Sequence, residues 1–166
     1  LIMIEIKPNT FIYEFKNALK KDDCLNIIKR FEENKEEHYE GKIGQNLNKD
    51  LDIKKSTDLF ISGKENWRDV DKLFFTALAN SLNEFKNEID FFKGPFKDMG
   101  YGIQRTGPGQ FYHWHIDGGS HDFSNRQLVA IFYLNDVEEK QGGTTDFLHQ
   151  GVNVIPEAGK LILFPP

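Results

Sequence analysis

The chain has 166 residues, a formal net charge of −5 and charged side chains interspersed along its length. That length predicts one domain with a sizeable core, and 15 phenylalanines predict a core rich in aromatic rings. The charge pattern argues against a nucleic-acid-binding module, which usually carries a basic patch, and no apolar run reaches the roughly 20 residues of a membrane span. A single cysteine, Cys24, leaves no intrachain disulfide and fits a reducing compartment. We therefore expect a cytoplasmic protein with no nucleic-acid or membrane partner, in which Cys24 is an inert thiol.

The first 98 residues favour helices with a few short strands. Residues 11–15 alternate like a strand, and either Asp22 or Asp23 can cap a helix that runs to about Glu33. The buried stripe of that helix should hold Leu25, Ile28 and Phe31. Residues 34–53 are polar and predict a long loop, and residues 58–62 predict a strand.

A second helix is predicted over residues 69–89, where apolar side chains recur with helical spacing. Its core-facing side should hold Val70, Leu73, Phe74, Ala77, Leu78, Leu82 and Phe85.

From Met99 onward the pattern changes to short strands separated by Gly, Pro, Asn and Asp turns, which indicates a β-sandwich or barrel. The predicted strands are 101–106, 111–117, 127–134, 144–148, 152–155 and 160–164, with a tight turn at 156–159. Helices followed by a run of strands define an α+β fold.

The most informative motif is His115-x-Asp117, near the end of the predicted strand 111–117. Residues two apart in a strand share one face, so the imidazole and the carboxylate can point the same way. With a second histidine from elsewhere they would form the 2-His-1-carboxylate triad, which leaves positions on Fe(II) open for a cosubstrate and O₂.

Several ordered stretches from residue 101 onward resemble the Fe(II)/2-oxoglutarate-dependent oxygenases, specifically the prolyl 4-hydroxylase-like branch. The stretch 109–117 (GQFYHWHID) resembles the family's GQxYxxHxD motif. The others are 126–128 (RQL), 133–135 (YLN), 142–147 (GGTTDF, like GGETxF) and 159–165 (GKLILFP, like GxxxxFP). Together, and in the right order, these stretches are far more specific than any one of them.

The resemblance implies a double-stranded β-helix, a cupin-like jelly roll, formed by residues 99–166, with residues 1–98 as helical support within one domain, 1–166. It implies His115 and Asp117 as metal ligands and Fe(II), 2-oxoglutarate and O₂ as cofactors, and it allows ascorbate as an accessory reductant. The family's distal histidine follows the FP strand. The third ligand is therefore expected C-terminal to Pro166, beyond the last residue of this sequence.

The resemblance also assigns residues to the cosubstrate and the substrate. Tyr133, Thr145 and Thr106 are expected to contact 2-oxoglutarate, although Thr106 stands where the family often has a tyrosine. Tyr112 and Arg126 are expected on the substrate side, and a structural ion pair of Arg126 is an equal alternative.

The implied reaction is hydroxylation of an unactivated C–H bond coupled to decarboxylation of 2-oxoglutarate. Its substrate is a prolyl residue in a peptide or a small molecule, and the loops 34–57 and 118–126, expected around the mouth of the site, should determine which. One alternative is a non-catalytic jelly-roll binding module. Another is a cupin-type metal protein using His113 and His115, although the positions where that motif needs a glutamate hold Gly119 and Ser120.

Several other residues have simpler interpretations. His38, His121 and His149 are expected to be solvated. Trp114 alternates with the ligands and is expected to pack in the core.

Overall fold

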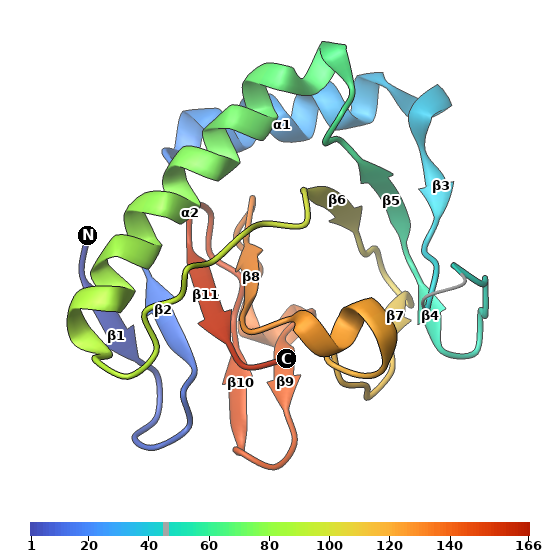
Figure 1. Cartoon of the computed structure of the whole chain (residues 1–166). Coiled ribbons are helices and arrows are strands. Elements are labelled where there is room, and N and C mark those ends of the chain that lie inside the picture. Colours follow the sequence, from blue (N-terminus) through green and yellow to red (C-terminus); the bar gives the residue numbers. More distant parts are fainter. Residues whose placement is uncertain (45–46) are drawn as a thin grey trace.

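The computed structural model describes residues 1–44 and 47–166 (Figure 1). The helices are α1 (Lys21–Glu33) and α2 (Arg68–Glu88), with 3₁₀ turns at Lys35–Glu37, Glu65–Trp67, His121–Asn125 and Glu139–Gln141. The strands are β1 (Met3–Glu5), β2 (Tyr13–Phe15), β3 (Tyr39–Glu40), β4 (Lys54–Lys55), β5 (Thr57–Phe60), β6 (Gly102–Arg105), β7 (Phe111–Tyr112), β8 (Val129–Phe132), β9 (Thr145–Phe147), β10 (Val152–Val154) and β11 (Leu161–Phe164). The α+β expectation is confirmed.

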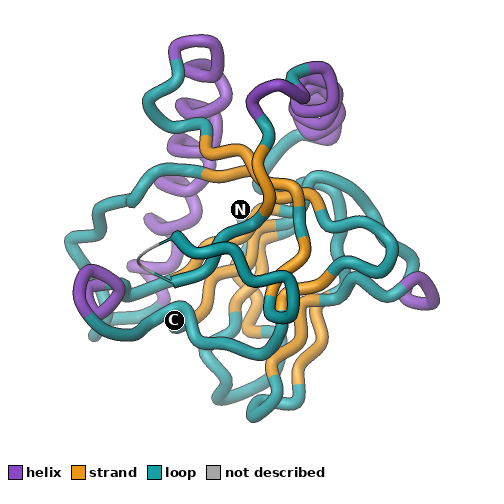
Figure 2. Tube along the Cα trace, turned by 90° about the vertical axis from the view of Figure 1, so that its right-hand side faces the viewer, coloured by secondary structure: helices purple, strands orange, loops and turns teal. Residues whose placement is uncertain are grey.

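The strands pair antiparallel throughout the part of the chain that is described. The sheets have the orders β1-β2-β11-β8, β3-β5-β6, β10-β9 and β4-β7. Both helices lie on the same side of the strands, as the two views together make clear (Figures 1 and 2).

Strand β11 is the centre of the C-terminal core, because all four of its residues are buried. Leu161 and Leu163 pack with β2 and with Phe85 of α2, whereas Ile162 and Phe164 pack with Val152 and Val154 of β10. Successive side chains of a strand point to opposite faces, so a strand covered on both faces needs a continuous apolar run. The sequence Leu-Ile-Leu-Phe supplies that run.

The two helices share a second core with β5 and β6. Cys24, Ile27 and Phe31 of α1 and Val70, Phe74 and Ala77 of α2 surround Leu59, Ile61 and Ile103. Phe132 of β8 also packs against this cluster, so the N-terminal helices and the C-terminal strands have a continuous interior.

The predicted second helix is confirmed within one residue at each end, and so is its buried stripe. Two details of the first helix were wrong. Lys20 occupies the N-cap position and makes no side-chain capping bond, and Leu25 is 64% exposed while Cys24 is fully buried. The inner stripe begins one residue earlier than predicted because i, i+3 and i, i+4 spacing fits both 24-27-31 and 25-28-31.

The segment predicted as a long loop is partly paired. Strand β3 pairs with β5, and Ile43 pairs with Asn48 in an isolated bridge; directly after the segment, β4 pairs with β7. Residues 45 and 46 of that predicted loop lie outside the described residues. Among the residues that are described, no helix is long and apolar enough to cross a membrane.

Candidate metal centre

The His115-x-Asp117 motif follows a very short ladder between β4 and β7. Tyr112 lies opposite Lys54, Phe111 lies opposite Lys55, and the backbone N–H of His113 donates to Ile53 O at 2.8 Å. Strand β7 itself ends at Tyr112, so the strand predicted to reach Asp117 was wrong. The chain turns after the ladder.

That turn orients the His115 ring. His115 Nδ1 lies 2.7 Å from the backbone oxygen of His113, and an imidazole nitrogen facing a carbonyl carries the proton. The lone pair of the neutral ring is then on Nε2, which lies 3.3 Å from Asp117 Oδ1. Two ligands at right angles on an ion, each about 2.1 Å from it, lie about 3.0 Å apart. The turn therefore brings the predicted pair together at a separation that suits one metal ion.

Without a metal, Nε2 can carry a second ring proton, and the charged imidazole then forms an ion pair with Asp117. The hydrogen bond to Asp117 raises the pKa of His115, against the opposing effect of burial. About a third of each side chain is exposed (32% for His115 and 30% for Asp117), so an ion can reach both. A metal would take the place of the proton that they share.

The backbone of Asp117 is held by a side chain from the segment that leads into β8. Arg126, three residues before β8, donates from Nη1 to Asp117 O at 2.8 Å, and its guanidinium lies 4.2 Å from the ring centroid of Phe123. Val129 lies opposite Phe164 in the β8–β11 ladder, so residues before β8 and after β11 meet at one end of the sheet. A Cβ on Gly118 would lie 3.6 Å from Pro166 Cβ. Figure 1 shows the C-terminal end beside the segment that joins β7 to β8.

Tyr133 and Thr145 form a second pair. Their hydroxyl oxygens lie 2.6 Å apart, and Tyr133 packs against the cluster around Ile162 and Phe164. Burial raises the pKa of Tyr133 to about 12, so the phenol stays protonated near neutral pH and can donate a hydrogen bond. The structure therefore brings two of the three predicted cosubstrate residues together.

Thr106 lies apart from that pair. It is exposed after β6, and its hydroxyl lies 3.5 Å from Gln104 Nε2. Among the described residues no hydrogen bond joins it to Tyr133, Thr145, His115 or Asp117.

Two of the simpler interpretations were wrong. Trp114 is 55% exposed, because the turn after His113 directs it away from the core. His38 is half-buried: its ring stacks on Phe31 at 4.1 Å and its Nε2 lies 2.8 Å from Phe31 O. His121 and His149 are exposed, as predicted.

The donor set fits part of an iron site. Among the described residues no group of three His, Cys, Asp or Glu side chains could hold a metal, which leaves His115 and Asp117 as a pair. His113 Nδ1 instead accepts a hydrogen bond from Trp114 N at 2.7 Å, so it is engaged with the backbone.

Sequence reasoning placed Tyr112 on the substrate side without its contact to His115, and it missed Lys54. The ring of Tyr112 stacks on His115 with centroids 3.6 Å apart, and Lys54, which is 7% exposed, places Nζ 4.8 Å from the Tyr112 centroid. The β4–β7 register, which places Lys54 opposite Tyr112, cannot be predicted from the spacing of apolar residues.

Comparisons with known proteins agree with this geometry. Residues 101–166 match the model of the 2OG-Fe(II) oxygenase superfamily, whose members use Fe(II), 2-oxoglutarate and O₂. No curated protein sequence matches the chain.

The solved structures show the fold. A viral collagen prolyl hydroxylase from Paramecium bursaria Chlorella virus 1, in its 2-oxoglutarate complex, superposes with a TM-score of 0.69 at 18% identity, covering 97% of this chain and 81% of the viral one. A prolyl-4-hydroxylase from Pseudomonas putida gives a TM-score of 0.61 at 20% identity, covering 95% of this chain and 81% of the bacterial one. The chain is thus similar to the prolyl hydroxylase-like 2-oxoglutarate oxygenases, which confirms the predicted resemblance, and it has a jelly-roll fold with added helices. The family match implies Fe(II), 2-oxoglutarate and O₂ as cofactors, whereas ascorbate stays a prediction.

Proposed function

We propose that the protein is an Fe(II)- and 2-oxoglutarate-dependent dioxygenase that hydroxylates an unactivated C–H bond, with a prolyl residue in a peptide as the substrate. The observation that carries the proposal is the 3.3 Å separation of His115 Nε2 and Asp117 Oδ1, inside the stretch that matches the oxygenase family. The solved relatives named for prolyl hydroxylation support the choice of substrate.

In this proposal His115 Nε2 and Asp117 Oδ1 hold the iron, and a histidine C-terminal to Pro166 is the third ligand. The position of Pro166 beside Gly118 supports the latter, because a residue following Pro166 would lie close to the pair. When bound, iron with 2-oxoglutarate and O₂ supplies the oxidising chemistry, in which the cosubstrate becomes succinate and CO₂. The His113 carbonyl accepts from Nδ1–H, so Nε2 is the nitrogen that gives up its proton to bind the metal, and Arg126 holds the Asp117 backbone in place.

The Tyr133–Thr145 pair is proposed to bind a carboxylate of 2-oxoglutarate. Both groups are hydroxyls, and one of the two protons can be directed at a ligand while the other maintains the 2.6 Å bond between them. The cosubstrate role of Thr106 and the substrate-side roles of Tyr112 and Arg126 remain predictions.

We also propose that residues 99–166 form the strands of a double-stranded β-helix, and that residues 1–98 belong to the same domain. The packing of Phe132 against the helical core and of Phe85 against β11 supports one domain. A cytoplasmic location is likewise proposed, on the strength of the single, buried Cys24.

The test is succinate release by the full-length protein with Fe(II), 2-oxoglutarate and a proline-containing peptide. We expect His115→Ala and Asp117→Ala to abolish succinate release and His113→Ala to retain it. His113 is the matched control, because it lies in the same segment and would be a ligand in the cupin alternative. Loss of activity only in His113→Ala and His115→Ala would favour that alternative, and no succinate from the wild-type protein would favour the binding module.

Hydroxylation of the peptide tests the substrate. A mass increase of one oxygen on a proline-containing peptide, absent when the proline is replaced by alanine, is the expected result. Succinate release that does not depend on any peptide would point to a small-molecule substrate instead.

A further inference from the structure

Lys54 is a charged side chain that is buried inside the protein. Only 7% of the residue is exposed, and a buried ammonium is strongly disfavoured unless it is paired. Its partner is Asp58, whose Oδ2 lies 3.1 Å from Nζ and whose other carboxylate oxygen accepts a 2.8 Å hydrogen bond from Ser56. The lysine head is therefore held at a fixed point.

The lysine stem is confined as well. A Cβ on Gly41 would meet Lys54 Cε at 2.8 Å and Cδ at 3.0 Å, and would also meet Ser56 Oγ. The backbone of Gly41 is in turn bonded to Ser56 O at 3.1 Å. No room remains beside the stem, so Lys54 has little freedom to change rotamer.

The fixed ammonium faces an aromatic ring. Tyr112 is the cross-strand partner of Lys54, and Nζ lies 4.8 Å from its centroid, within the range of a cation–π interaction. The same ring stacks on His115 with centroids 3.6 Å apart and planes 11° apart. Asp58, Lys54, Tyr112 and His115 thus form an uninterrupted series of contacts.

These contacts fix the plane of the His115 imidazole, which its hydrogen bond to His113 O alone does not fix. The bond from Nδ1 to His113 O sets the direction of the imidazole within its plane but allows the plane to rotate about that bond. A parallel ring at stacking distance removes this rotation. With the plane fixed, the Nε2 lone pair is directed toward the point that it shares with Asp117 Oδ1.

We propose that Lys54 and Tyr112 are positioning residues for His115: Lys54, anchored by Asp58, fixes the Tyr112 ring, and the ring fixes the imidazole plane for metal binding. The proposal rests on the proposed function for its metal, but the contact itself exists without one. Partners that orient a ligating histidine typically change metal affinity about 10–100-fold when they are removed.

The experiment uses the full-length protein and two readouts. The first is the NMR shift of the His115 ring protons in the metal-free protein, which a stacked tyrosine moves upfield. The second is the Kd for Mn(II), measured by calorimetry. Tyr112→Leu removes the stack and Tyr112→Phe restores it. Because Lys54→Met alone would leave Asp58 unpaired, the lysine is tested as Lys54→Met together with Asp58→Asn.

We expect Tyr112→Leu and the Lys54/Asp58 double variant to lose the upfield shift and to bind Mn(II) about 10-fold more weakly, with melting temperatures checked to ensure folding. Tyr112→Phe should match the wild type in both readouts. Lys55→Met is the matched control, since Lys55 lies 5.6 Å from the Phe111 ring one position along the same ladder, and it should change neither.

An unchanged shift or an unchanged Kd in the double variant would overturn the proposal. If the wild-type protein binds no Mn(II), the proposed function fails, and the shift in the metal-free protein still decides whether Lys54 and Tyr112 position His115. The two failures are therefore distinguishable.

Discussion

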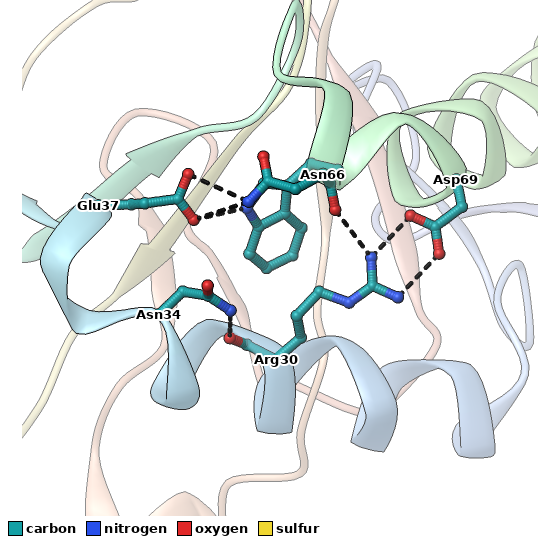
Figure 3. Close-up of polar contacts among 6 residues, drawn as sticks. Arg30, Asn34, Glu37, Asn66 and Asp69 are labelled. Carbon is teal, nitrogen blue, oxygen red and sulfur yellow. Dashed lines mark hydrogen bonds and ion pairs between the residues drawn. The ribbon is translucent and has the colours of Figure 1, made fainter.

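Glu37 joins the segment after α1 to the start of α2 through three donors. It accepts hydrogen bonds from Trp67 Nε1 at 3.0 Å, from Asn66 Nδ2 at 3.2 Å and from Lys64 Nζ at 3.3 Å. Figure 3 shows Glu37 facing Asn66, with the neighbouring Arg30–Asp69 ion pair linking α1 to α2. Trp67 is fully buried, so Glu37 is the acceptor for an indole N–H that sits against the core.

Two substitutions of Glu37 distinguish the effect of its charge from the effect of its hydrogen-bond acceptor. Glu37→Gln keeps an acceptor but turns charge-assisted bonds into neutral ones, a difference of about 1 kcal/mol. Glu37→Ala leaves the indole N–H without its acceptor, which costs about 1–3 kcal/mol. For a chain of this size, 1 kcal/mol corresponds to about 2–4 °C in Tm. At about 3 °C per kcal/mol we expect losses of about 3 °C for Glu37→Gln and about 3–9 °C for Glu37→Ala.

The pH dependence gives the sharper test. The hydrogen bond from Trp67 lowers the pKa of Glu37 from its ordinary value of 4.5, with further contributions from Asn66 and Lys64. A carboxyl with a depressed pKa stabilises the fold above its unfolded pKa, and this stabilisation is lost as the pH falls through the folded pKa. The stability difference between wild type and Glu37→Gln should therefore be constant from pH 7 to about 5 and shrink below pH 4.5.

The assay is urea unfolding followed by tryptophan fluorescence over that pH range. Glu36→Gln is the matched control, because Glu36 is the exposed neighbour on the same 3₁₀ turn and should have almost no effect. A Glu37→Gln difference that does not depend on pH would refute the role given to the charged carboxylate.

Three further predictions concern the site and the core. Tyr133→Phe, which removes the hydroxyl bonded to Thr145, should weaken 2-oxoglutarate binding about 10-fold by calorimetry and cost about 1 kcal/mol in unfolding; equal affinity would exclude the phenol from the cosubstrate site. Arg126→Met, which removes the donor to Asp117 O, should weaken Mn(II) binding about 10-fold with little change in Tm; a large Tm loss with unchanged affinity would make Arg126 purely structural. Leu163→Ala in the fully buried strand β11 should cost about 2–5 kcal/mol in urea unfolding, and a loss below 1 kcal/mol would contradict its place in the core.

Elements with a strong, uninterrupted period were predictable from the sequence. The helix over 68–88 and the buried strand 161–164 needed only the spacing of their apolar residues. The helix is buried along one face and has apolar residues at helical spacing, and the strand is buried on both faces and is apolar throughout. The 24-27-31 stripe of α1 was missed because a neighbouring stripe has the same spacing and a leucine in place of the cysteine.

The site was predictable as a set of ligands but not as a geometry. The motif gave His115 and Asp117, whereas the expected strand ended early because its partner β4 is only two residues long. A turn held by the His113 carbonyl, rather than strand alternation, brings the two side chains together. The same turn exposes Trp114. Lys54 meets Tyr112 only through the β4–β7 pairing, which is distant in sequence. Arg126 and His38 contact residues nine and seven positions away across turns, and neither contact follows a helical or strand period.

Metal binding tests the central claim most directly. Anaerobic calorimetry of the full-length protein with Fe(II) should give one ion per chain, and either His115→Ala or Asp117→Ala should weaken that binding by at least 10-fold. His113→Ala should bind as the wild type does. Undiminished one-to-one binding in the His115→Ala and Asp117→Ala variants would contradict the assignment of this pair as the iron ligands.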